Sequence, residues 1–217
     1  MVNRPAAGGG SWVEVEPERF AGWCDRFAER HGRPLTVAVT PEAVTATAAD
    51  GVTAACHPPF PPLVPGPGSD PLAQLAAHAL RERTVGVLLV RRGGYAAGVF
   101  EGVHLADSKV GSRYVQGRTK AGGWSQQRFA RRREGQAREA YAAAADAACK
   151  VLIPRAGALD ALVTGGDGAA LAALRTDPRL KPLWAKESAP FLNVGDPRLA
   201  ELRKAPEGFR AIQIRVL

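Results

Sequence analysis

Hydrophobic residues in the first part of the chain follow a helical period and then an alternating one. Apolar side chains three and four positions apart predict a helix from Pro17 to His31, and Gly32 is suited to ending it. The dipeptide Asp50-Gly51 further on is typical of a hairpin turn. Alternating runs around it predict three short strands, at residues 35–40, 43–48 and 52–56. This part of the chain therefore indicates a small α+β segment.

A proline-rich connector follows. Seven prolines and two glycines fall between Pro58 and Pro71, and this composition disfavours both helix and strand. We therefore expect a small N-terminal α+β segment with its connector over residues 1–70, and a main domain over residues 71–217. The main domain opens with a helix that runs to about Arg83 and repeats its apolar residues on one face.

The rest of the main domain shows the pattern of a sheet with flanking helices. Apolar and alternating runs predict three successive strands, from Thr84, from Tyr95 and from about Val103, with a turn at Gly93-Gly94 between the first two. Later patterns predict a long helix from Ser125 to about Lys150, a strand at 161–163, a helix at 167–174, a helix opening at Asp196-Pro197, and a last strand over 212–216. The predicted fold class is α+β / α/β, a layered fold with a mixed sheet.

Composition fits a globular protein that needs no membrane. Hydrophobic residues make up 46% of the 217 positions and charged residues 23%, enough for a substantial core. The longest strongly apolar run, Val85 to Val90, is too short to span a bilayer, and residues 1–10 lack the apolar centre of a signal peptide. We expect a cytoplasmic protein with no membrane partner.

The cysteines predict neither a disulfide framework nor a metal site. Cys24, Cys56 and Cys149 occur singly, which fits reduced thiols within a core. Cys56 adjoins His57, but no second pair of ligands stands at a suitable spacing. We expect no metal and no cofactor.

The net charge is concentrated in one stretch. Residues 109–138 hold nine basic side chains and a single acid, Glu134, and their balance of +8 equals the formal net charge of the whole chain. Such a local patch is typical of a nucleic-acid binder, although a solvated basic helix remains the alternative. The basic residues are Lys109, Arg113, Arg118, Lys120, Arg128, Arg131, Arg132, Arg133 and Arg138.

A glycine-containing loop lies within this stretch. Gly122 and Gly123 allow positive φ and close approach of the backbone to a ligand. Ser125 is suited to capping the helix that follows. The arginines in the first turns of that helix lie at the positive end of its dipole, where cations are unfavourable. A bound polyanion would remove this repulsion, so the loop and helix together indicate a functional site.

The run RYVQGRTKAGGWSQQRFARRREGQ, residues 113–136, resembles the catalytic loop and following helix of the Vms-like release-factor family, particularly its compact actinobacterial peptidyl-tRNA hydrolases. That family is related to the middle domain of eukaryotic and archaeal class-one peptide-chain release factors, whose Gly-Gly-Gln loop enters the peptidyl-transferase centre. The resemblance extends over about Thr84 to Leu217. It implies a ribonuclease-H-like layered fold, which agrees with three meandering strands followed by helix, strand and helix.

The resemblance also implies roles for individual residues. The Ser-Gln pair of the family matches Ser125-Gln126, so Gln126 is the expected catalytic residue, with Gln127 as the alternative. Gly122 and Gly123, with Ser125 and Gln127, would support the loop. A glutamine amide cannot act as a general base, but it can orient water and donate to a developing oxyanion. The expected contacts to tRNA or rRNA are Arg113, Arg118, Lys120, Arg128, Arg131, Arg132 and Arg133.

Nuclease chemistry of the ribonuclease-H kind needs clustered carboxylates on the sheet. Residues 85–90 contain none, and Asp167 is a lone acid that we interpret as a helix N-cap. The glycine-rich run at 164–168 lacks the lysine of a P-loop, so we interpret it as a strand-to-helix turn.

The predicted function is that of a peptidyl-tRNA hydrolase, a release factor that frees nascent chains on stalled or split large ribosomal subunits. The expected partners are the large subunit and peptidyl-tRNA, and protein partners stay open. The segment 1–70 does not resemble a stop-codon-reading domain, so codon-directed termination is not expected. Two alternatives remain: an endonuclease that cuts the tRNA acceptor end, and a non-catalytic factor that binds the ribosome through the basic helix.

Overall fold

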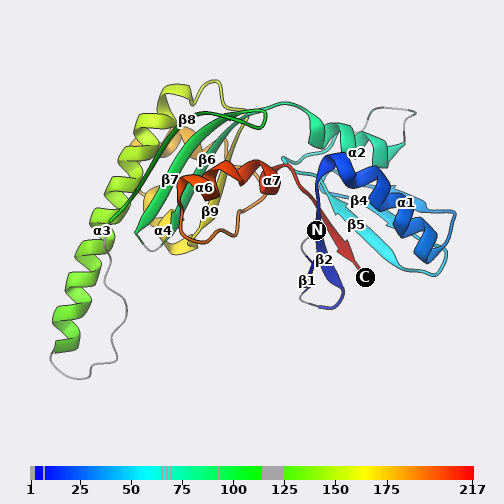
Figure 1. Ribbon diagram of the computed structural model, residues 1–217, viewed down its shortest axis with the longest axis horizontal. Coiled ribbons are helices and arrows are strands. Elements are labelled where there is room, and N and C mark those ends of the chain that lie inside the picture. The colour runs from blue at the N-terminus through cyan, green and yellow to red at the C-terminus, as the bar shows by residue number, and fades with distance from the viewer. Residues whose placement is uncertain are drawn as a thin grey trace. The chain divides into compact units, whose positions relative to one another are not determined.

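The computed structural model describes residues 3–6, 8–64, 66, 68, 70–91, 93–113 and 125–217 (Figure 1). The chain forms two compact units. The N-terminal unit combines Met1–Glu82 with Pro206–Leu217, and the central unit is Arg83–Ala205. Each unit has its own sheet and its own hydrophobic core.

The N-terminal unit is built on an antiparallel sheet of six strands in the order β1-β2-β10-β5-β4-β3. The strands are β1 (Asn3–Pro5), β2 (Ser11–Val15), β3 (Thr36–Val39), β4 (Val44–Thr47), β5 (Thr53–His57) and β10 (Ile212–Val216). The three strands predicted between residues 35 and 56 are confirmed as β3, β4 and β5. The sequence analysis missed β1 and β2.

Two helices cover one face of this sheet (Figure 1). A 3-10 helix, η1 (Pro17–Arg19), leads into α1 (Phe20–His31), which ends at Gly32 as predicted. The second helix, α2 (Pro71–Leu80), is capped by Asp70, whose carboxylate accepts a hydrogen bond from the Leu72 amide at 3.0 Å. Alternate strand residues meet these helices in a core that includes Phe20, Phe27, Val44, Cys56, Leu75, Ile212 and Ile214.

The three cysteines are unpaired, as predicted. Burial, together with the charges of Asp25 and Asp70, raises the pKa of the Cys24 thiol to about 12. Burial also raises the pKa of Cys56. Because the thiolate is the reactive form, both side chains behave as small apolar residues at neutral pH.

The central unit has a mixed sheet of four strands in the order β8-β7-β6-β9. The strands are β6 (Thr84–Arg91), β7 (Gly94–Glu101), β8 (His104–Ser112) and β9 (Ala161–Gly166). The first three form an antiparallel meander, and β9 lies parallel to β6. Parallel strands need a crossover connection, and the long helix between β8 and β9 is part of the one that leads to β9. The predicted order of elements, three strands followed by a helix, a strand and a helix, is confirmed, as is the layered fold.

Helices lie on both faces of this sheet. Most of them share one core on one face: α3 (Ser125–Val151), the 3-10 helices η2 (Ile153–Arg155) and η3 (Pro178–Leu180), α4 (Gly168–Arg175) and α5 (Lys181–Trp184). On the other face α6 (Leu199–Arg203) places Leu202 against Gly98 of β7, where a Cβ would lie 3.0 Å from the leucine side chain. A side chain at this position of the strand would fit only if the neighbouring leucines moved slightly.

The two units divide the chain differently from the predicted boundary near residue 70. Helix α2 lies in the N-terminal unit because Leu75 and Ala79 are fully buried in its core. Strand β10 also belongs there, since it pairs with both β2 and β5. The short helix α7 (Ala205–Phe209) leads into β10, and its Phe209 lies 5.9 Å from the ring of Phe60.

Candidate functional site

The long helix α3 carries the candidate residues. It begins at Ser125, the predicted residue, and its 27 residues correspond to a length of about 40 Å. The backbone of Gln126, Gln127, Arg128 and residues 131–133 lies in its first turns. The side chains of residues 125–134 lie outside the description, as do all of Gly122, Gly123, Arg118 and Lys120.

The C-terminal half of α3 is anchored to the sheet. Ala140 is the first buried residue in the part of the helix whose side chains are described. Ala144, Ala147 and Ala148 are completely buried against the sheet and its neighbours, and their small side chains allow close packing. Tyr141 is partly buried and packs against the same core. Figure 1 shows the N-terminal half extending beyond the strands.

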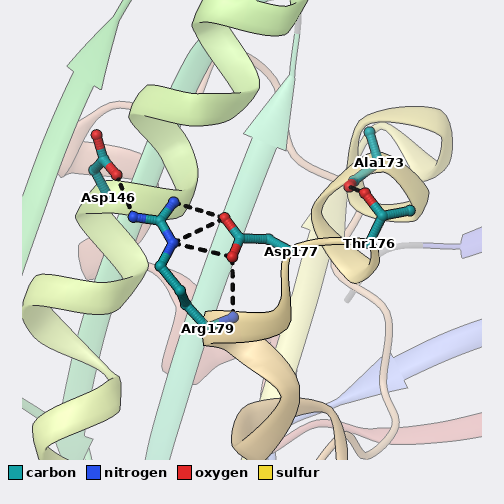
Figure 2. A network of polar contacts seen from close by, with 5 residues as sticks. All are labelled: Asp146, Ala173, Thr176, Asp177 and Arg179. Carbon is teal, nitrogen blue, oxygen red and sulfur yellow. Dashed lines mark hydrogen bonds and ion pairs between the residues drawn. The ribbon is translucent and has the colours of Figure 1, made fainter.

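A polar network ties the anchored half of α3 to η3 (Figure 2). Arg179 donates from Nη1 to Oδ1 of Asp146 on α3 at 2.8 Å, and from Nη2 to Oδ2 of Asp177 at 2.6 Å. Its Nε also contacts both Asp177 oxygens, at 3.0 and 3.1 Å. These hydrogen bonds lower the pKa of the Asp177 carboxyl and raise that of Arg179. The Arg179 guanidinium therefore joins η3 to a residue of α3 that lies 33 positions earlier in the sequence.

The described chain before the loop ends at Arg113. Its amide donates to the carbonyl of Gly93 at 2.8 Å, which fixes the end of β8 to the turn between β6 and β7. The Arg113 side chain is exposed. Among the predicted RNA-contacting residues it is the one whose side chain falls within the described part, and its exposure leaves it accessible to a ligand.

A polar cleft lies where β6 and β9 end. Its volume is about 590 Å³, and its lining comprises Arg91, Gly166, Asp167, Gly168, Asn193, Val194 and Gly195. The Arg91 guanidinium donates to the Val194 carbonyl at 2.6 Å and so crosses the cleft. Asp167 accepts from the Ala169 amide at 2.9 Å, which confirms it as the N-cap of α4.

The glycine-rich run at 164–168 is confirmed as a strand-to-helix turn. Gly166 has φ of 101°, and a Cβ there would overlap the Val90 carbonyl. Within the ranges that the structure describes, no group of three or more His, Cys, Asp or Glu side chains is arranged to hold a metal ion. The interior of β6, Val85 to Val90, consists of buried apolar residues and Gly86.

Sequence reasoning missed a polar cluster beside this turn. The buried Thr164 hydroxyl donates to Glu187 at 3.0 Å, and Arg175 forms an ion pair with the same carboxylate at 2.6 Å. The Arg175 guanidinium also lies 4.8 Å from the centre of the Trp184 ring. The cluster links β9, α4 and α5, and no local sequence signal joins residues so far apart.

This layered unit, with a long helix after its third strand, belongs to a translation release factor. Residues 83–215 match the family described as the Actinobacteria/chloroflexi VLRF1 release factor, and the chain belongs to that family. The resemblance of residues 113–136 to the Vms-like release factors is thereby confirmed. No curated protein shows significant sequence similarity to the chain.

Two solved structures are similar to the chain. One is the archaeal translation termination factor aRF1, with 17% identity and a TM-score of 0.41, covering 71% of this chain and 46% of that one. The other is Dom34 of S. cerevisiae, described as a translation termination-like factor involved in RNA quality control pathways and interacting with Hbs1. It has 8% identity and a TM-score of 0.33, covering 94% of this chain and 66% of that one. The chain thus spans less than half the length of aRF1.

Proposed function

We propose that the protein is a peptidyl-tRNA hydrolase that frees nascent chains from tRNA on stalled or split large ribosomal subunits. The observation that carries this proposal is the family match over residues 83–215, which includes the loop and all of α3. The proposed partners are the large ribosomal subunit and peptidyl-tRNA, and the proposed location is the cytoplasm. In the described part of the chain no helix is both long and apolar enough to cross a membrane.

The reaction is hydrolysis of the ester between the peptide and the terminal ribose of the tRNA. A water oxygen bonds to the ester carbonyl carbon, the bond from that carbon to the ribose oxygen breaks, and the ribose oxygen takes up a proton. Gln126 would hold the water with its side-chain amide and donate to the negative oxygen that develops on the carbonyl. Because the amide neither gains nor loses a proton near neutral pH, a ribose hydroxyl of the tRNA would assist the proton transfer.

The fold supports this role through the way it holds α3. Ala140 to Val151 are fixed by the sheet and by the Arg179 network, so the helix is a rigid support for the residues at its other end. The fifteen positions from Ser125 to Glu139 correspond to about 22 Å of helix. Gly122 and Gly123 precede that end and would let the loop backbone approach RNA closely.

Basic residues around the loop would bind the phosphates of tRNA and rRNA. Arg113 lies at the end of β8, and Arg128 with residues 131–133 lies in the first turns of α3. Arg118 and Lys120 fall between these two anchors in sequence. Phosphates near the start of a helix would also interact favourably with its dipole, which offsets the cost of placing arginines there.

One experiment separates this proposal from its alternatives. Purified large subunits carrying peptidyl-tRNA, labelled in both peptide and tRNA, are incubated with the protein, and both products are resolved. Ester hydrolysis yields a free peptide and a tRNA of full length. An endonuclease that cuts the acceptor end would yield a shortened tRNA and a peptide that is still esterified to the released 3′ nucleotides. A binding factor would produce a salt-sensitive complex and no products.

A further inference from the structure

The sheet of the N-terminal unit has two faces of different chemistry. The residues that face α1 and α2 are the apolar ones, such as Val15, Val44 and Ile214. The alternate residues point to the opposite side and are absent from the hydrophobic core. They are half-buried or exposed. We call this side the open face; the residues that matter here are Arg4, Trp12, Thr45, His57, Gln213 and Arg215.

The strand register places a tryptophan between two arginines on the open face. Arg4 of β1 is directly opposite Trp12 of β2, and Trp12 is opposite Arg215 of β10. The row continues through Ala55 of β5 to Thr45 of β4. Directly opposed residues have Cβ atoms about 5 Å apart, so the row forms one continuous strip across five strands.

A second ring lies beside the tryptophan. His57 of β5 has its ring centre 5.4 Å from that of Trp12, at an angle of 44°. Its Nδ1 lies 3.1 Å from the carbonyl of Glu42. A carbonyl can only accept, so Nδ1 carries a proton and the ring is held in place. The open face therefore presents two fixed rings at one position.

The other side chains of this face are small or polar. The paired positions on that side of the strands carry alanine and threonine but no large aliphatic residue. Protein interfaces are commonly anchored by large apolar side chains, and among the paired strand positions described on this face Trp12 alone supplies one. At the paired strand positions of this face the charge is positive on balance, because Arg4 and Arg215 outnumber one acid, Glu14, which pairs with Arg4 at 3.3 Å.

Aromatic rings flanked by arginines on one face of a sheet are suited to unpaired nucleotides. Bases stack on the rings, and the arginines contact phosphates or stack in turn. We propose that the open face binds single-stranded RNA, with bases on Trp12 and His57 and the backbone along Arg4 and Arg215. This site lies in a different unit from Gln126, and most of its residues precede the family match at residue 83. It does not depend on the proposed hydrolysis.

The test uses the full chain in which Arg131, Arg132 and Arg133 are replaced by Ala, so that binding by α3 is reduced. A fluorescein-labelled single-stranded RNA of about twelve nucleotides is titrated by anisotropy. We expect Trp12→Ala to weaken binding by about 5-fold to 150-fold, the effect of losing one stacked base. Trp12→Phe keeps a ring and should restore most of the affinity. Phe191→Ala removes an exposed ring of the central unit and should change nothing. Equal affinity of Trp12→Ala and its parent would overturn the proposal.

A second measurement needs no substitution and so does not depend on a variant folding. RNA containing 4-thiouridine is crosslinked to the unaltered chain by light, and the labelled peptides are mapped. We expect crosslinks in the peptides that contain Trp12 or His57. Crosslinks confined to the central unit would refute a site on the open face. A duplex RNA of the same length should bind this face poorly, and an equal loss on Trp12→Ala with the duplex would reject base stacking.

Discussion

Residues 125–139 and 140–151 of α3 belong to one continuous helix, but they follow helix chemistry to different degrees. The second half is rich in alanine, the best helix former, and most of its alanines are buried. The first half has two glutamines directly after Ser125 and four arginines within its first nine residues, where the helix dipole disfavours cations. The comparison suggests that the second half provides stability and the first half provides function. If so, substitutions in one half should leave the property of the other unchanged.

The largest effect is expected at Gln126. Replacement by Ala should slow peptide release about 10²-fold to 10³-fold, because one contact to the water or the oxyanion is lost. Ribosome binding and thermal stability should stay near the parental values. Release is measured from labelled peptidyl-tRNA on large subunits, and binding by co-sedimentation.

Gln127→Ala is the matched control for Gln126. Adjacent residues on a helix point about 100° apart, so a single ester can contact only one of them. A slow Gln127 variant beside a normal Gln126 variant would move the catalytic role by one residue. Parental rates for both would contradict the hydrolase proposal and favour a binding factor.

The next effect is on binding. Replacing Arg131, Arg132 and Arg133 together by Ala should weaken binding to ribosomes or tRNA and leave the melting temperature unchanged. If each side chain contacts a phosphate, the dependence of log affinity on log salt should flatten by about one unit per lost contact. An unchanged slope would remove these residues from the RNA interface.

Glycines outside α3 test the same division between function and stability. Gly122→Ala or Gly123→Ala should reduce turnover with little change in melting temperature, since the bound loop is expected to need close approach to RNA. Gly166→Ala should instead destabilise the fold by about 1–3 kcal/mol, because its φ of 101° and the nearby Val90 carbonyl exclude a side chain. Release assays and thermal melts on all three variants distinguish these roles. A large fall in melting temperature for Gly122→Ala or Gly123→Ala would mean that these glycines serve a structural turn.

The smallest effect concerns the network in Figure 2. Arg179→Ala should lower the melting temperature by at most about 4 °C at neutral pH, because its ion pairs are largely exposed, and should leave peptide release unchanged. The pKa of Asp177 is lowered in the folded protein, so its contribution to stability is present above its unfolded pKa and is lost as pH falls through the folded value. The difference between parent and variant should therefore shrink below about pH 4. A constant difference down to pH 3 would show that the charge of Asp177 is not involved.

Local signals in the sequence predicted the parts of the structure that local chemistry determines. Ser125 follows two glycines and precedes a run without glycine or proline, and α3 begins there. Asp167 follows a strand and opens a helix, and it caps α4. A helix expected to open at Asp196-Pro197 instead begins at Leu199, because the backbone of Arg198 is extended, with φ of −108° and ψ of 167°.

Pairings between distant segments could not be predicted in this way. Ile212 is opposite Val15, and His57 lies beside Trp12, yet no local pattern connects either pair. The boundary at residue 70 was predicted from a proline-rich segment. Such a segment indicates a break in regular structure, but it does not indicate which strands a later strand pairs with. Of the candidate site, the helix that carries Gln126 was predictable in place and extent. The side-chain roles remain predictions.

Strand β10 has a consequence for the order in which the protein folds during its own synthesis. It lies between β2 and β5, although the whole central unit is translated before it. Until residues 212–216 leave the ribosome, the β1-β2 hairpin has no neighbour to join it to β5-β4-β3. N-terminal domains usually fold first during synthesis. Here the order is reversed, because the central unit has all its strands while the N-terminal sheet is still in two pieces. A nascent chain halted just short of residue 212 would expose two unpaired strand edges, which are sites for aggregation.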